Sequence, residues 1–187
     1  MSLPSEQPLD PAPGRRVVHL WNRPETEFPA LVPVGILHFT RTEPSEVAVT
    51  AVLAYSNGFE FLVTRLLRPD GPGFGHEAGP TPPGLRRDSP AVRQPMTIGL
   101  GFADGSQVTG DVPSPAGNEV PTGRILNFGG SVGSTHRSDS RWWTWPLPPR
   151  GRLDFICRLG AAETRVSMDA RLILEASQRS ARAWPDA

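Results

Sequence analysis

The chain lacks several features that would point directly to a function. None of its 187 residues is lysine, so all 19 basic residues are arginine and a lysine nucleophile or Schiff base is excluded. Cys157 is the only cysteine, which excludes an intrachain disulfide and a cysteine-built zinc site. The 19 basic residues balance 19 acidic ones, so the basic surplus typical of nucleic-acid binders is missing. We therefore expect no nucleic-acid partner.

Long apolar runs are missing as well. No segment approaches the roughly 20 apolar residues that a membrane-spanning helix needs, and residues 1–16 contain no apolar stretch typical of a secretory signal. We therefore expect a cytoplasmic protein with no membrane partner. The four histidines show no metal-ligand spacing, and neither a Walker motif nor a dinucleotide-binding motif occurs. No cofactor and no metal are predicted.

Proline and glycine, in contrast, are abundant, with 22 and 19 residues. Residues 1–14 contain four prolines and few apolar side chains, a composition that does not repay its ordering entropy. Residues 69–95 contain seven prolines and five glycines without any periodicity. We predict a disordered tail at 1–14 and a surface insert at 69–95, within one domain that spans residues 15–187.

Two hairpins are predicted from turn residues. In "EVAVTAVLAYSNGFEFLVTRLLR", two β-rich runs flank Asn57-Gly58, a pair typical of a type I′ turn, and this turn would place Ala54 opposite Phe61. In "MTIGLGFADGSQVTG", residues 104–105 are Asp-Gly and predict a second turn of the same type.

Further strands are predicted in "VVHLW", "LVPVGILHFT", "RILNF", "RWWTW", "RLDFICRL" and "TRVSMD". After Asp169 the apolar spacing changes to a helical period that extends toward Trp184. Short strands, Gly and Pro turns and one terminal helix predict a mainly β fold. We expect an antiparallel β-sandwich, immunoglobulin-like in the loose sense, with a C-terminal α-helix.

The segment "NFGGSVGSTHRSDSRWWTWPLPP" offers the strongest sign of chemistry. Residues 129–133 match G-x-S-x-G with Ser131 at the centre, and His136 and Asp139 follow. That motif positions its serine on a sharp turn from a strand into a helix, and the polar, then aromatic, then proline-broken residues that follow are unsuited to a helix. A flexible glycine turn is therefore favoured, and a serine hydrolase using this loop is the alternative.

Three tryptophans follow the glycine-rich loop. On a strand, Trp143 and Trp145 would point to one face and Trp142 to the other. We expect the first two to lie in the core and Trp142 to face a partner, together with Arg137 and Arg141. The preferred hypothesis is a non-enzymatic, cytoplasmic protein-interaction module that binds a protein partner through a Trp and Arg surface near residues 129–145.

Two other possibilities stay open. An apolar ligand could be carried between the sheets, in a pocket lined by Trp143, Trp145 and Phe155. A homodimer could form through a sheet edge.

The segments "EVAVTAVLAYSNGFEF", "IGLGFADGSQVT" and "WWTWPLPPRGRLDFICRL" followed by "ETRVSMDARLILEAS" also support a resemblance. The chain resembles, over about residues 30–180, a family of uncharacterised actinobacterial proteins with a W-x-W-P-L-P-P motif after a glycine-rich loop. The motif corresponds to residues 143–149. The resemblance implies a loop that varies around a poly-Gly theme, and it brings no functional residues with it.

Overall fold

The computed structural model describes residues 19–42, 45–70, 73–74, 96–110 and 121–184. The predicted tail at 1–14 and most of the insert at 69–95 lie outside these ranges. The described elements are β1 (Glu27–Phe28), β2 (Ala30–Leu31), β3 (Leu37–Thr42), β4 (Ser45–Ala54), β5 (Phe59–Leu67), β6 (Met96–Gly101), β7 (Gln107–Thr109), β8 (Ile125–Gly133), β9 (Arg137–Trp145), β10 (Arg152–Leu159), β11 (Ala162–Asp169), α1 (Arg171–Ser177) and β12 (Ala181–Arg182).

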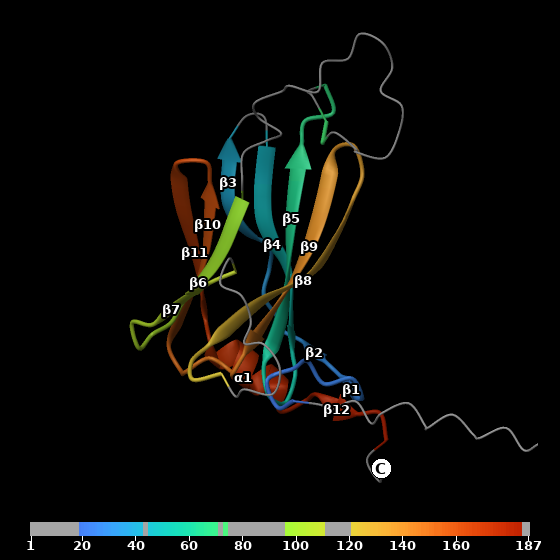
Figure 1. The fold of residues 1–187 in the computed structure, drawn as a ribbon, viewed down its shortest axis with the longest axis vertical. Coiled ribbons are helices and arrows are strands. Elements are labelled where there is room, and N and C mark those ends of the chain that lie inside the picture. The colour runs from blue at the N-terminus through green and yellow to red at the C-terminus, as the bar shows by residue number, and fades with distance from the viewer. Residues whose placement is uncertain (1–18, 43–44, 71–72, 75–95, 111–120, 185–187) are drawn as a thin grey trace, which may run out of the picture.

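These strands form antiparallel sheets, as the sequence predicts. A six-stranded sheet has the order β2-β4-β5-β9-β8, with β3 also paired to β4, and a four-stranded sheet has the order β11-β10-β6-β7. The short strands β1 and β12 pair with each other. Figure 1 shows α1 near one end of the long strands, on the same side of the molecule as β1, β2 and β12. The mainly β, antiparallel structure with a C-terminal helix is thus confirmed.

One apolar core is shared by the two large sheets and the helix. Phe61 of β5 and Phe155 of β10 meet edge to face, with ring centroids 5.0 Å apart. Ile173 and Ala176 of α1 are completely buried in the same cluster. The helix therefore contributes to the same core as the two large sheets.

A β-bulge in β4 keeps both halves of this strand facing the core. Val49 pairs with Val63 before the bulge, and Val52 pairs with Phe61 after it. Val49 and Val52 are both buried in the same cluster, although strict alternation would place residues three apart on opposite faces. The extra residue compensates for the odd spacing, so the three valines of "VAVTAV" all face the core.

The hairpin predicted around Asn57-Gly58 is confirmed, but its register and turn type are wrong. Ala54 pairs with Phe59 rather than Phe61, and neither Asn57 nor Gly58 has a positive φ. The Asn57 amide instead donates to the carbonyls of residues 20 and 22, at 2.7 and 3.0 Å. A Cβ atom at Gly58 would lie 2.6 Å from Trp143 Cη2. Tertiary contacts therefore explain this residue pair better than turn geometry does.

The second predicted hairpin joins β6 to β7, and its turn also differs from type I′. Gly101 pairs with Gln107, and Gly105 has a φ of 83° whereas Asp104 has no positive φ. The carboxylate of Asp104 accepts hydrogen bonds from the Ser106 amide at 3.0 Å and from Arg124 at 2.7 Å. A longer loop with glycine in the left-handed position connects these strands.

The two ends of the described chain depart most from expectation. Residues 19–21 of the predicted strand "VVHLW" are irregular, and "LVPVGILHFT" is a strand only at its start and from Leu37 onward. The helix ends at Ser177, and the chain then forms β12, so Trp184 does not lie on a helix. Within the described ranges, no helix has the length and apolar character needed to cross a membrane.

Candidate functional site

The glycine-rich segment is an edge strand, and the predicted glycine turn is wrong. Residues 129–133 belong to β8, which pairs on one side with β9 and, among the described residues, with no strand on the other. The register shifts between Phe128 and Gly130, where a bulge leaves Gly129 without a partner residue. Residues 134–136 make the turn into β9 instead. Figure 1 shows β8 and β9 as a long, twisted hairpin at one side of the molecule.

This geometry does not assemble the hydrolase alternative. Ser131 lies opposite Ser140, whereas Asp139 lies opposite Val132, so Ser131 and Asp139 are on opposite faces of the hairpin. Within the described part of the chain, the Ser131 hydroxyl makes no hydrogen bond to His136 or any other histidine. A nucleophile, base and acid in mutual contact are therefore missing among these residues.

Trp142 is buried, which contradicts its predicted exposure to a partner. Its side chain is 7% exposed and belongs to the core shared by the two sheets. The indole N–H donates to Ser140 Oγ at 3.1 Å, and the ring lies 5.3 Å from that of Phe128. Gly110 packs so closely on the indole that a Cβ atom there would overlap the ring. Trp142 is therefore part of the core to which both large sheets contribute.

Trp143 points to the opposite face and is also buried, as expected. It forms a second cluster with Trp21, Tyr55 and Ile125, against which the half-buried Trp145 packs. The Trp143 indole N–H donates to the carbonyl of residue 21 at 2.8 Å. Phe155 belongs to the core on the other side of the six-stranded sheet, so the predicted pocket between Trp143, Trp145 and Phe155 is not formed.

Residues 19–27, here called the strap, cover this second cluster. Arg23 Nη1 lies 2.6 Å from Glu60 Oε2, and this hydrogen bond raises the pKa of Arg23. The Glu27 carboxylate accepts from the amide and the hydroxyl of Ser56, both at 2.6 Å. Burial raises the pKa of Tyr55 beneath the strap. The strap is therefore held by the polar contacts of Arg23 and Glu27 and by the buried side chain of Trp21.

The two predicted arginines differ in their availability. Arg137 donates to both oxygens of Asp139, at 2.6 and 3.0 Å, and this contact raises the pKa of Arg137 and lowers that of Asp139. Arg141 is exposed on β9 and makes no hydrogen bond or ion pair with the residues that the structure describes. Phe128 and Val132, both in β8, are 54% and 69% exposed. We call β8 with Arg141 the β8 edge.

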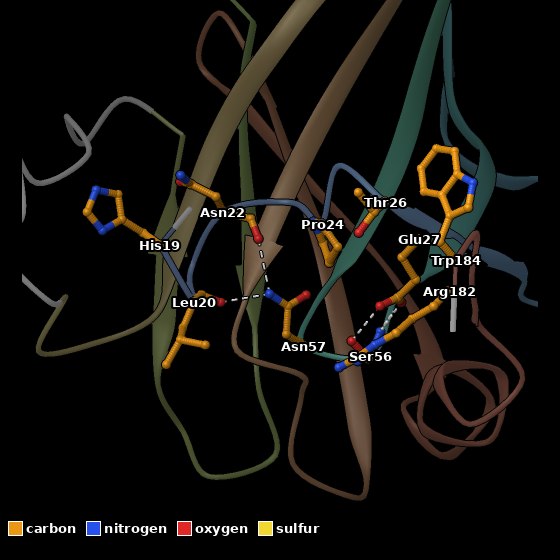
Figure 2. Close-up of a pocket in the computed structure, with 10 residues that line it drawn as sticks. All are labelled: His19, Leu20, Asn22, Pro24, Thr26, Glu27, Ser56, Asn57, Arg182 and Trp184. Carbon is orange, nitrogen blue, oxygen red and sulfur yellow. Dashed lines mark hydrogen bonds between the residues drawn. The ribbon is translucent and has the colours of Figure 1, made fainter. Parts of the chain in front are cut away.

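A pocket of about 320 Å³ lies beside the strap, and the sequence does not predict it. Figure 2 shows its lining, which comes from the strap, from the turn between β4 and β5, and from the segment that contains β12. The lining residues are His19, Leu20, Asn22, Pro24, Thr26, Glu27, Ser56, Asn57, Arg182 and Trp184. Because three segments far apart in the sequence build it, no local motif could have revealed it.

In the described ranges, no three His, Cys, Asp or Glu side chains are grouped so that they could hold a metal ion. The most exposed large apolar side chains instead lie at the β8 edge, in the pocket and near β1 to β3. Comparison of the chain with protein-family models, curated proteins and solved structures finds no match.

Proposed function

We propose that this protein is a non-enzymatic interaction module that binds an extended segment of a partner protein along the β8 edge. The observation that carries the proposal is the composition of this edge strand. Its nine residues, "ILNFGGSVG", include no charged residue and no proline, and two large apolar side chains on it are exposed. An uncharged edge of this length is a ready template for another strand.

The other sheet edges in the described chain are protected. β7 has three residues and β2 has two, which is too short to guide a partner strand. β11 carries Glu163, Arg165 and Asp169, and β3 lies beside it. Charged residues and coverage are the usual protection against edge pairing. Only the β8 edge combines length with the absence of charge among the described strands.

The proposed partner segment is an extended strand with alternating apolar side chains. Phe128 and Val132 lie on opposite sides of the bulge and on opposite faces of the sheet, so an added strand would contact one on each face. Arg141 lies beside Gly130 in the register and has no acidic partner in the described chain. An acidic residue in the partner strand would complement this guanidinium.

We infer further that the two large sheets form a β-sandwich, immunoglobulin-like in the loose sense. Support comes from the core to which both sheets contribute and from the contact between Phe61 and Phe155. The resemblance to the actinobacterial family and the cytoplasmic location stay predictions. A second copy of this chain would be one partner whose edge offers the required uncharged strand.

Photo-crosslinking tests the proposal. A benzophenone amino acid replaces Val132, and, in a matched control, replaces the exposed Ser167 on the edge strand β11. We expect the Val132 probe to capture a specific protein in the native host and the Ser167 probe not to capture it. Hydrogen exchange of the purified complex should then show new protection in residues 125–133.

Edge-blocking variants complete the test. Val132→Lys places a charge on the edge, and we expect binding of the captured partner to weaken by at least about tenfold. Ser167→Lys should leave binding unchanged. Equal binding by Val132→Lys and wild type, or protection confined to strands other than β8, would contradict the proposal.

A further inference from the structure

The pocket beside the strap combines one available cation with exposed apolar walls. Leu20 is 81% exposed and Trp184 is 64% exposed, and both line this pocket. Apolar side chains gathered in one concavity lose more solvent contact when a single ligand covers them than scattered ones do, which is why such sites recur in ligand binding. The volume of about 320 Å³ suits a small molecule.

The charges in the pocket are unequally engaged. Both oxygens of Glu27 accept hydrogen bonds from Ser56 at 2.6 Å. Arg182 lies opposite Glu27 in the pairing of β1 with β12. Its guanidinium nevertheless forms no hydrogen bond or ion pair with the described residues. In Figure 2 the Arg182 side chain extends toward Ser56 at the tip of the turn between β4 and β5. The carboxylate of Glu27 is thus already hydrogen-bonded within the protein, whereas the guanidinium of Arg182 can bind a ligand.

The pocket also has fixed walls. Asn57 donates to the carbonyls of residues 20 and 22, which ties the strap to the turn between β4 and β5. The ring of His19 stacks on Trp21, with centroids 4.4 Å apart and planes 13° apart. The amide of residue 183 donates to the carbonyl of Thr26 at 2.8 Å, which holds β12 against the strap. A ligand would therefore meet a preformed site.

From these observations we infer that the pocket binds a small organic carboxylate with an apolar body. The guanidinium of Arg182 pairs with the carboxylate in a charge-assisted hydrogen bond, and Leu20 and Trp184 contact the apolar body. The inference is independent of the β8 edge, because it uses different residues at a different place on the molecule.

A pair of probes tests the charge requirement. We expect calorimetry to show that the wild-type chain binds 4-phenylbutyrate at least about tenfold more tightly than its uncharged amide, 4-phenylbutyramide. Arg182→Gln should abolish this preference, so that both compounds bind alike. Trp184→Ala should weaken both compounds while preserving the preference for the acid.

A matched control distinguishes the effect of the charge in the pocket from the effect of removing any exposed arginine. Arg179→Gln removes an exposed arginine that bonds the carbonyl of residue 175 on α1 and does not line the pocket, so it should leave the preference unchanged. Thermal unfolding confirms that each variant is folded. Three results would overturn the inference: equal binding of acid and amide by the wild type, no binding of the acid at about 10 mM, where a probe this small should bind, or an unchanged preference in Arg182→Gln.

Discussion

Cys157 illustrates how burial controls a single reactive group. Its side chain is 1% exposed in the core, and burial raises the pKa of the thiol to about 11. In the unfolded chain the thiol ionises near pH 8.5. Because only the unfolded state releases this proton between about pH 8.5 and 11, rising pH through this range favours unfolding. Below pH 8.5 the contribution of the buried neutral thiol is fully retained.

We therefore expect Cys157 to resist thiol reagents in the folded protein. At pH 8, Ellman's reagent should react at least about 100-fold more slowly with the native chain than with the chain in concentrated urea. The absorbance of the released thiolate measures both rates. Cys157→Ala is the control and should release none. Similar rates in the two states would show that the thiol is accessible in the folded protein.

The tryptophans show what residue-level patterns in the sequence reveal and what they leave open. Alternation along β9 correctly predicts that Trp142 and Trp143 point to opposite faces. It does not reveal what covers each face. Gly110 packs against Trp142, and the strap covers Trp143. Both Gly110 and the strap are far from β9 in the sequence. The residues next to Trp142 in the sequence therefore could not reveal that its side chain is buried.

At the scale of elements, the ion pair that fastens the strap should be important for stability. The Glu60 side chain is 7% exposed and that of Arg23 is 47% exposed. Arg23→Ala would leave a buried carboxylate without its cation, and we expect it to lower the free energy of unfolding by about 1–3 kcal/mol. Adding Glu60→Gln should recover part of this loss, because the amide needs no counter-charge.

Urea unfolding measures these free energies, and an exposed arginine provides the control. Arg171 faces Asp169 and Glu175, whose side chains are more than half exposed. Arg171→Ala should change the free energy of unfolding by no more than about 0.5 kcal/mol. If Arg23→Ala and Arg171→Ala lowered the free energy of unfolding equally, the ion pair of Arg23 with the buried Glu60 would add no particular stability.

Element positions were easier to predict than their pairing. Both hairpins lie where turn residues indicated them, and β9, β10 and β11 cover the apolar runs found in the sequence. The register around Asn57-Gly58 differs by two residues, an even shift that leaves Ala54 on the same face as Phe61. The short helix α1 and the strand β12 replaced one longer predicted helix. Trp184 is thereby placed in the pocket.

For the whole molecule, strand order should determine local stability. β5 is hydrogen-bonded on both sides and carries Phe59, Phe61 and Val63 in the core, whereas β8 is bonded on one side only among the described residues. We expect amides at the centre of β5 to exchange with solvent at least about 100-fold more slowly than unpaired amides of β8. Hydrogen exchange at low protein concentration measures both. Comparable protection of the two strands would contradict this strand order.

The sequence predicts the class of the fold, mainly antiparallel β, but not the order of the strands in the sheets. Short runs separated by turns correctly indicate antiparallel sheets, since neighbouring strands in the chain tend to pair. The pairings of β5 with β9 and of β6 with β10 join residues far apart, and no local pattern specifies them. The edge position of β8 follows from these distant pairings, and so could not be predicted from the sequence.

The fastening of the strap has a consequence for how this protein can change during evolution. The side chains of Asn57 and Trp143 bind carbonyl groups of residues 20, 21 and 22, which every amino acid supplies. Leu20 and Asn22, whose side chains line the pocket, are thus free to mutate while the anchors stay constant. Ligand preference could drift, or be diversified in a library, on an unchanged scaffold.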